Sequence, residues 1–311
     1  MIDLHVHTSM SDGTLSPVSL VRLAAAKGIR AIAVTDHDTV AGVCPAQAEG
    51  ELLGVEVIAG VEISTQWVSG ILHILGLFID PYDRLMLNSL DYLRRCRLER
   101  IPKILDRLSD CNVLISSNEV NRQAVGGVPG RPHVAEIMVQ KGYVKTIQEA
   151  FDRYLKKGAP AYVEKVKLPP IEAVKLITRV GGLAVLAHPY SLNENEPECL
   201  EKILRDLISY GLQGIETYYP RHTPQQTKAY LDLARKLDLL VSGGTDFHGS
   251  NKPEVQLGII PGRDPIPYSL LDHLKTRKKT LYSDNGSSED KNILPASEVY
   301  STDRTCRGRA E

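Results

Sequence analysis

Hydrophobic residues in the first 82 positions come in short runs separated by an amphipathic stretch. The runs are too short for helices and predict strands at residues 2–6, 30–35, 55–63 and 71–79. Between the first two, residues 17–27 predict a helix, with Ser16 as its N-cap and Gly28 as its stop. The polar turn Ser69-Gly70 predicts that the last two strands form a hairpin.

The alternation stops and later resumes. Residues 83–162 are helical and charged in pattern, which predicts an inserted helical subdomain. Beyond it, the pattern predicts helices at residues 171–180, 199–210 and 224–237, strands at 183–187, 214–218 and 239–242, and a last helix from about Tyr268. From Asp284 the composition turns polar and loses periodicity, which predicts a disordered tail.

Short strands joined by helices imply parallel pairing, in either a barrel or a doubly wound sheet. Residues able to bind metal follow several of these strands, which favours a barrel with its site at the C-terminal face. We therefore expect an α/β barrel domain from residues 1–82 and 163–282, a helical insertion at 83–162 and a tail at 283–311.

Imidazole and carboxylate side chains recur at or near the ends of the predicted strands. His5 and His7 are two apart in a strand and so point to the same face, and the same spacing separates Asp246 from His248. Further candidates for the same site are Asp12, His37, Glu62, His73 and His188. This pattern predicts a multinuclear metal site with hydrolytic chemistry.

Composition excludes some classes of protein. The 311 residues carry 37 basic and 38 acidic side chains, a net charge of −1, so no overall basic field attracts long nucleic acid. The five cysteines are scattered and form no CxxC pair, which predicts reduced thiols. The N-terminus has no signal-peptide pattern and no apolar run is long enough to cross a bilayer, so we expect a cytoplasmic protein.

Five motifs together resemble the PHP (polymerase and histidinol phosphatase) family. They are D-L-H-V-H-T-S-M-S-D-G at 3–13, T-D-H-D-T at 35–39, G-V-E-I-S at 60–64, A-H-P at 187–189 and G-G-T-D-F-H-G at 243–249. The resemblance extends to about residue 282. It implies a distorted (β/α)7 barrel with a trinuclear metal site at its C-terminal face.

The resemblance also implies a ligand set. One metal would be held by His5, His7, Glu62 and Asp246, a second by Asp12, His37 and His248, and a third by Glu62, His73 and His188. Of these, the catalytic residues would be Asp12, His37, Glu62, His188, Asp246 and His248. A buried structural histidine is the alternative for His73. Asp36 and Asp38 would orient imidazoles rather than bind metal.

Many family members have histidine where this chain has Asp12. A hard oxygen ligand there favours Mn²⁺, while Mg²⁺, Fe and Zn²⁺ stay open.

Two further segments are candidate phosphate clamps. Residues 126–133 present Arg131 and His133 at the start of a helix, and residues 218–223 present Arg221 and His222 directly after a strand. A plain helix start and a surface helix cap are the alternatives. Both segments resemble one PHP subfamily, which acts on nucleoside 3′,5′-bisphosphates and trims short RNA. The four residues become substrate-binding candidates by that resemblance.

The leading hypothesis is hydrolysis of the 3′-phosphate of a nucleoside 3′,5′-bisphosphate such as pAp, by hydroxide formed between two metals. The closest alternative is a 5′→3′ exoribonuclease acting on short RNA through the same site. A histidinol-phosphate phosphatase and a non-catalytic PHP module are weaker alternatives. A basic groove would favour the nuclease, but we interpret the arginines between residues 94 and 107 as a solvated helix face. The expected partner is a small nucleotide or short RNA, and the oligomeric state stays open.

Overall fold

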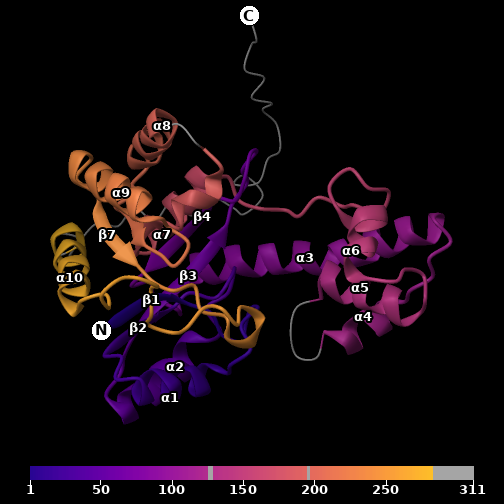
Figure 1. Cartoon of the computed structure of the whole chain (residues 1–311), viewed down its shortest axis with the longest axis horizontal. Coiled ribbons are helices and arrows are strands. Elements are labelled where there is room, and N and C mark those ends of the chain that lie inside the picture. The colour runs from indigo at the N-terminus through magenta and orange to yellow at the C-terminus, as the bar shows by residue number, and fades with distance from the viewer. Residues whose placement is uncertain (125–128, 195–196, 283–311) are drawn as a thin grey trace, which may run out of the picture.

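The computed structural model describes residues 1–124, 129–194 and 197–282. Within them, one seven-stranded sheet runs in the order β1 to β7 and curls into a nearly closed barrel (Figure 1). The strands are β1 Ile2–Val6, β2 Ala31–Val34, β3 Glu56–Ser64, β4 His73–Leu77, β5 Leu183–Leu186, β6 Gly214–Tyr218 and β7 Leu240–Gly243. The predicted α/β barrel is confirmed, whereas the predicted tail lies outside the described residues.

The fourth strand is the exception in a sheet that is otherwise parallel. β4 runs antiparallel to both β3 and β5, which confirms the predicted hairpin. His73 was expected in the middle of a strand but is the first residue of β4, where it pairs with Ser64 at the end of β3. Because the strand is reversed, its first residue lies at the edge where the parallel strands end.

Close backbone approach joins the end of β7 to β1. The N–H of Asp246 donates to the carbonyl of His5 (2.8 Å), and the N–H of His7 donates to the carbonyl of Phe247 (2.9 Å). A Cβ on Gly244 would lie 2.4 Å from the backbone nitrogen of His5, so only glycine permits this approach. The contact holds the histidines of β1 against the segment that carries Asp246.

Helices surround the barrel. They are α1 Pro17–Ala26, α2 Val43–Leu53, α7 Pro170–Arg179, α8 Pro197–Ile208, α9 Pro224–Lys236 and α10 Tyr268–Tyr282. Their apolar faces pack on the strands, as Leu20 of α1 and Leu271 of α10 do. The sequence pattern missed α2, which has no side-chain N-cap and contains Pro45 and Gly50.

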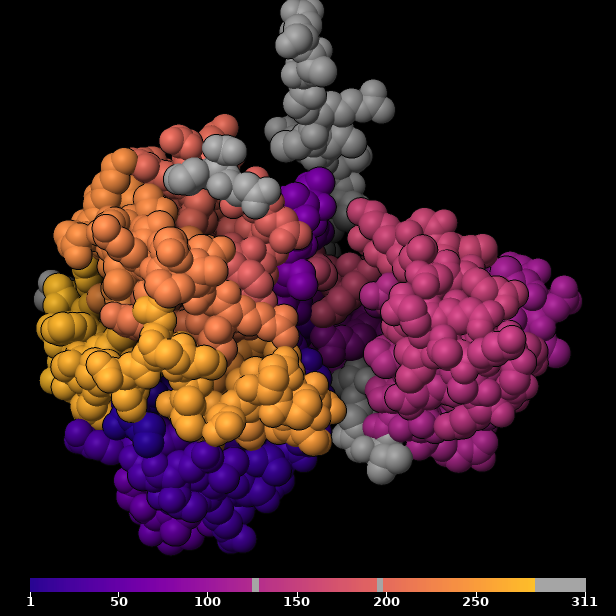
Figure 2. Space-filling view, in the orientation of Figure 1, coloured from indigo at the N-terminus to yellow at the C-terminus, as the bar shows by residue number. Residues whose placement is uncertain are grey.

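The insertion is helical, as predicted, and lies beside the barrel (Figure 1). It consists of α3 Arg84–Asp110, α4 Ser117–Gln123, α5 Arg131–Gln140, α6 Ile147–Ala150 and a π-helical turn Phe151–Leu155. The first half of α3 packs on the barrel core through Met86 and Leu90. Its second half, from Ile101, packs in a separate core within the insertion. α3 therefore connects two cores, and Figure 2 shows a hollow between the surfaces of the barrel and the insertion.

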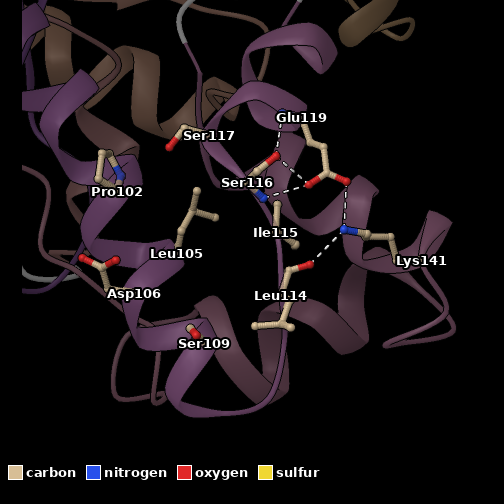
Figure 3. A pocket seen from close by; sticks show the side chains of 10 residues that line it. All are labelled: Pro102, Leu105, Asp106, Ser109, Leu114, Ile115, Ser116, Ser117, Glu119 and Lys141. Atoms are coloured by element: carbon tan, nitrogen blue, oxygen red, sulfur yellow. Dashed lines mark hydrogen bonds and ion pairs between the residues drawn. The ribbon is translucent and has the colours of Figure 1, made fainter.

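A second hollow of about 560 Å³ lies within the insertion, between α3 and the segment that leads into α4 (Figure 3). At its rim, Lys141 donates to Glu119 (2.8 Å) and to the carbonyl of Leu114 (2.9 Å). These contacts tie the end of α5 to α4 and to the segment before it, so Lys141 and Glu119 balance each other's charge within the insertion.

Two expectations from composition can be compared with the described residues. Their cysteines, Cys44, Cys96, Cys111 and Cys199, are free thiols, and Cys306 lies outside them. No described helix combines the length and the apolar character needed to cross a bilayer.

Candidate metal centre

Glu62, near the end of β3, lies at the centre of the predicted cluster. The carboxylate is buried, with 1% exposed. Its Oε2 atom lies 3.4 Å from His5 Nε2, 3.2 Å from His7 Nε2 and 3.0 Å from His37 Nδ1. Its Oε1 atom lies 2.8 Å from His73 Nδ1 and 2.9 Å from His188 Nε2. One carboxylate thus meets five imidazoles from four strands and the segments that follow them.

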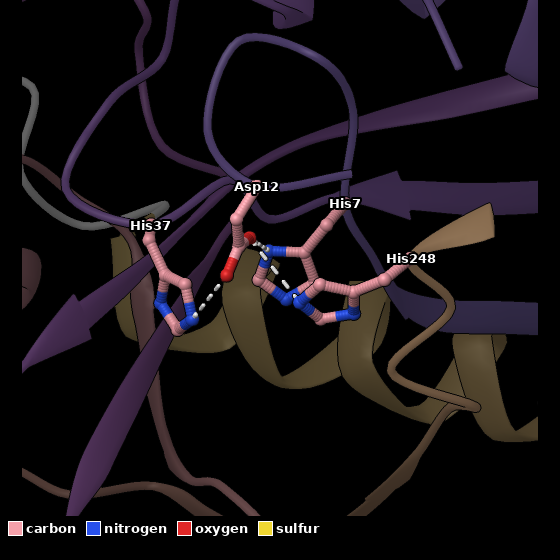
Figure 4. A group of neighbouring side chains, drawn as sticks. All are labelled: His7, Asp12, His37 and His248. Carbon is pink, nitrogen blue, oxygen red and sulfur yellow. Dashed lines mark ion pairs between the residues drawn. The ribbon is translucent and has the colours of Figure 1, made fainter. Parts of the chain in front are cut away.

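Two further carboxylates flank this arrangement. Asp246 Oδ1 lies 3.2 Å from His7 Nε2 and 3.6 Å from His5 Nε2. Asp12 Oδ1 lies 3.2 Å from His248 Nε2 and 3.5 Å from His7 Nδ1. Figure 4 shows the Asp12 carboxylate between His37 on one side and His7 and His248 on the other. All nine residues predicted as ligands are therefore gathered at one end of the barrel.

Three sets of side chains among the described residues place their ligand atoms within 4.8 Å of one another. They are His5, His7, Glu62 and Asp246; His7, Asp12, His37 and His248; and His37, Glu62 and His73. The first set is the one expected for the first metal. The second set contains the three residues expected for the second metal together with His7. In the third, His37 stands where His188 was expected, while His188 approaches the same Glu62 oxygen as His73.

Two of these residues have left-handed backbone conformations, which are rare outside glycine. His188 has φ 25° and Asp246 has φ 55°. Neighbouring groups hold both: the His188 N–H donates to Glu216 Oε2 (2.7 Å), and the Asp246 N–H donates to the carbonyl of His5 (2.8 Å). Strain of this kind is typical of functional sites.

Glu216, in β6, supports the cluster from outside, and the sequence reasoning missed it. It is fully buried, accepts a hydrogen bond from His5 Nδ1 at Oε1 (3.0 Å) and accepts the His188 N–H at Oε2. A carboxylate behind a histidine fixes which ring nitrogen faces the ligand. The only signal in the sequence was one acidic residue within an otherwise strand-like segment, GIETY.

Asp36 and Asp38 have roles other than the expected orientation of imidazoles. Asp36 accepts hydrogen bonds from the backbone and hydroxyl of Thr8 (both 2.7 Å) and from Ser11 (2.6 Å). It therefore fixes the loop that carries Asp12. Asp38 accepts the N–H of Ser64 (2.9 Å) and faces two cations, Arg97 of α3 and Lys165 of the segment that follows the insertion.

The second oxygen of Asp246 is also held in place. Tyr219 donates its hydroxyl to Asp246 Oδ2 (2.8 Å), and Lys252 Nζ lies 2.6 Å from the same atom. These contacts leave Oδ1 facing His5 and His7.

Buried charges inside the cluster shift one another strongly. Burial opposes charge on His7, but the nearby carboxylates of Asp246 and Glu62 outweigh it and raise the pKa of His7 to about 9. Burial disfavours ionised Glu62, yet the imidazoles of His37, His73 and His5 hold the pKa of Glu62 well below its usual range. The metal-free cluster therefore binds protons that a cation would displace.

Several buried polar atoms of the cluster have no hydrogen-bond partner among the described residues, and they show whether the residues fit a metal. Within the described part of the chain, His5 Nε2, both ring nitrogens of His7, His37 Nδ1 and Glu62 Oε2 are buried without a hydrogen-bond partner. Burying such atoms unpaired costs free energy. They converge on common points, and mixed imidazole and carboxylate donors suit divalent cations. The cluster therefore fits bound metal.

The four candidate substrate residues lie outside this cluster. In the insertion, Arg131 donates from Nη1 to the carbonyl of Leu155 (2.9 Å), and its guanidinium lies over the rings of Phe151 and Tyr162. His133 accepts the N–H of Gly130 at Nδ1 (3.0 Å) and so caps its own helix. Residues 126–128 of this segment lie outside the described residues.

The other two residues follow β6. Arg221 is exposed and pairs with Glu254 (3.1 Å). His222 is buried, donates from Nδ1 to the carbonyl of Thr217 (2.9 Å) and packs against the rings of Tyr219, Tyr190 and Tyr230. Burial lowers the pKa of His222 to about 4, so the ring stays neutral. His222 therefore lies in an aromatic cluster, and its Nε2 atom is buried without a hydrogen-bond partner among the described residues.

A barrel with a buried cluster of imidazoles and carboxylates at the strand ends defines a class of metal-dependent hydrolases. The sequence model of the PHP domain family matches residues 3–164 of this chain. A 5′-3′ exoribonuclease of Haemophilus influenzae is 35% identical, covering 79% of this chain and 89% of the relative. A 3′,5′-nucleoside bisphosphate phosphatase of Chromobacterium violaceum is 31% identical, covering 89% and 97% respectively.

A solved structure supports the same conclusion. It is a candidate metal-dependent phosphoesterase of Bifidobacterium adolescentis, 29% identical, with a TM-score of 0.73 over 89% of this chain and 96% of that chain. The chain belongs to the PHP domain family. It is a metal-dependent phosphoesterase, a hydrolase of phosphate ester bonds.

Proposed function

We propose that the enzyme removes the 3′-phosphate from a nucleoside 3′,5′-bisphosphate such as pAp, which yields the 5′-monophosphate and inorganic phosphate. The observation that carries the proposal is the cluster of nine candidate ligand residues, with Glu62 at its centre and with several unpaired buried atoms. The relative that acts on such bisphosphates is covered over 97% of its length, which supports this choice of substrate.

The proposed ligand sets follow the three groups of side chains. His5, His7, Glu62 and Asp246 hold the first cation; His7, Asp12, His37 and His248 the second; and His37, Glu62 and His73, joined by His188, the third. When bound, divalent cations supply hydroxide at neutral pH and offset the charge that develops on the phosphoryl oxygens. Mn²⁺ is the proposed metal because Asp12 adds a hard oxygen.

The surrounding residues position the ligands. Glu216 orients His5 through Nδ1, so that Nε2 faces the cation. Tyr219 and Lys252 hold one oxygen of Asp246 and direct the other toward the cluster. The catalytic set of this proposal is Asp12, His37, Glu62, His188, Asp246 and His248.

A second candidate is 5′→3′ exoribonuclease activity on short RNA through the same centre. Two observations favour it: the relative from Haemophilus influenzae bears this name, and Arg97 of α3 turns toward the barrel rather than into solvent. Both reactions hydrolyse a phosphate ester. In the bisphosphate the phosphate is released as inorganic phosphate, whereas in RNA it stays attached to the next nucleoside.

The test measures phosphate release from pAp and stepwise trimming of a 5′-phosphorylated tetraribonucleotide. Both are assayed with Mn²⁺, with Mg²⁺ or Zn²⁺ in its place, and after chelation. We expect fast, chelator-sensitive release from pAp with the highest rate in Mn²⁺. Trimming that is faster than release from pAp would make the nuclease the main activity. If neither substrate turned over in metal-loaded protein, the nucleotide proposal would be wrong.

A further inference from the structure

Four cations gather where the insertion meets the barrel. Arg97 and Arg100 come from α3, and Lys165 and Lys167 come from the segment that returns from the insertion to the barrel. We name this set the junction cations. The interpretation of the α3 arginines as a solvated face holds for Arg94 and Arg95, whose side chains are 56% and 63% exposed. It is wrong for Arg97, which is 24% exposed.

Two of the junction cations, Arg97 and Lys165, lie next to the metal centre. Arg97 Nη2 lies 2.8 Å and Lys165 Nζ 3.1 Å from Asp38 Oδ2. Lys165 Nζ also donates to the hydroxyl of Ser64 (3.2 Å). Asp38 directly follows His37, one of the candidate metal ligands. A molecule bound at the metals is therefore next to the start of this basic strip.

The outer pair of junction cations has donors left over. Arg100 donates from Nε to the carbonyl of Val163 (2.7 Å), but its Nη2 is buried and has no partner among the described residues. The Lys167 ammonium likewise has neither a hydrogen bond nor an ion pair with any described residue. Unpaired cationic donors next to each other are suited to an anion with several oxygens.

The charges are also poorly balanced. Burial and then the neighbouring Arg131 lower the pKa of Arg100 to about 10. Burial lowers the pKa of Lys167, and Arg100 and Arg131 act in the same direction. The carboxylates that oppose these cations are Asp38, which Arg97 and Lys165 already share, and the exposed Glu164. An anion that enters this strip reduces the repulsion between like charges.

We propose that the junction cations bind a nucleotide phosphate group other than the one that is hydrolysed. This inference rests on the proposed function and names where its substrate is held. One phosphate lies at the metal centre while another lies between Lys165, Lys167 and Arg100. The second phosphate is either the 5′-phosphate of a nucleoside bisphosphate or a phosphodiester further along a short RNA. The chemistry of recognition is the same for both.

The test uses the full chain loaded with Mn²⁺ and adenosine 5′-monophosphate, which carries no 3′-phosphate, with adenosine as the comparison. The variant Lys165→Met/Lys167→Met removes two charges and keeps the aliphatic stems. Calorimetry should show binding of the monophosphate weakened by about tenfold or more, because charge-assisted hydrogen bonds are lost. Binding of adenosine should not change. The single variant Lys167→Met, which breaks no hydrogen bond or ion pair between described residues, should also weaken binding of the monophosphate.

Lys156→Met is the matched control, because it removes the same charge from a side chain that is 58% exposed. Mn²⁺ content is measured for every variant. Unchanged binding of the monophosphate in the Lys167→Met variant, or an equal loss for adenosine, would overturn the proposal. If binding of the monophosphate depends on the lysines but pAp is not hydrolysed, the junction cations bind phosphate and the proposed function is wrong.

Kinetics separate the two sources of the phosphate. If the junction holds a 5′-phosphate, the lysine variants raise KM for pAp by about tenfold and leave KM for adenosine 3′-monophosphate unchanged. If it holds RNA, KM rises for the tetraribonucleotide instead. An equal rise for adenosine 3′-monophosphate would contradict the proposal, because that substrate has no second phosphate.

Discussion

The metal centre and the four predicted clamp residues look alike in sequence and differ in the structure. At the centre, ring nitrogens of His5, His7 and His37 are buried without hydrogen-bond partners among the described residues. At the clamps, each residue has a polar contact within the chain, and among the four only His222 Nε2 is buried without a hydrogen-bond partner in the described residues. Arg131 bonds to a backbone carbonyl, His133 caps its helix, Arg221 pairs with a surface carboxylate, and His222 bonds to Thr217.

This difference distinguishes residues whose polar atoms are available to a ligand from residues whose polar atoms stabilise the fold. Buried polar atoms without partners destabilise a protein, so a cluster of them points to a bound group that satisfies them. An arginine or histidine whose donors are satisfied internally needs no ligand to explain it. Motifs record which side chains are present, and only the structure records which of their atoms are unpaired.

The largest effect is expected from Glu62→Gln, which tests the centre of this comparison. The amide keeps the size of the carboxylate but removes the charge that five imidazoles share. We expect phosphate release from pAp to fall by at least about 10³-fold, beyond the 10–100-fold typical of losing an outer partner of a ligand. Metal analysis should show less bound Mn²⁺. A variant with normal metal content and activity would mean that the cluster does not bind the catalytic ions.

A smaller effect is expected from Glu216→Gln, which leaves every proposed ligand in place. Glu216 accepts one hydrogen bond at each oxygen, from His5 and from the backbone of His188. An amide nitrogen cannot accept, so one of the two contacts is lost. We expect activity to fall by about 10–100-fold with little change in fold by circular dichroism. Wild-type kinetics would show that the orientation of His5 does not depend on this carboxylate.

Proton competition at the centre predicts opposite pH trends with and without metal. The pKa of His7, about 9 in the metal-free cluster, is raised relative to an unfolded value of about 6.5. A raised pKa stabilises the fold below the unfolded value, and this contribution is lost as pH rises toward 9. Apparent Mn²⁺ affinity changes the other way, by about tenfold per pH unit for each proton displaced.

The check is a series of thermal melts and Mn²⁺ titrations between pH 6.5 and 9. The melting temperature of metal-free protein should fall over this range, while Mn²⁺ affinity should rise. His222 serves as the internal contrast from the clamp set, because its pKa of about 4 gives it no proton to lose there. Mn²⁺ affinity that does not change with pH would argue against His7 as a ligand.

Much of the barrel followed from local pattern. The predicted strands and barrel helices agree with the observed bounds within two residues, since short apolar runs and caps such as Ser16 are local signals. The helix α2 was missed because it has no side-chain N-cap and contains proline and glycine. The site residues in motifs were found because strand spacing places His5 and His7 on one face.

Other features depend on segments that are distant in sequence. His73 reaches the centre because β4 runs antiparallel, so its first residue lies at the edge where β3 ends. Glu216 carries no motif, and its role appears only when β6 lies behind His5. The inward direction of Arg97 depends on Asp38, 59 residues away, and on the return of Lys165 to the same carboxylate. No periodicity in α3 records these contacts.

The smallest effect is expected from Arg221→Gln, which tests the other side of the comparison. The side chain is 54% exposed, and its described carboxylate partner, Glu254, is 58% exposed. Surface ion pairs contribute about 0–1 kcal/mol, so the free energy of unfolding should change by about 0.5 kcal/mol or less. We expect kcat/KM for pAp to stay within about twofold of wild type, with Arg235→Gln, another exposed and paired arginine, as the control. If KM for pAp instead rose by about tenfold while the control stayed normal, Arg221 would exchange Glu254 for a substrate phosphate. A satisfied ion pair would then no longer mark a residue as purely structural, and unpaired buried atoms would be one sign of function among several.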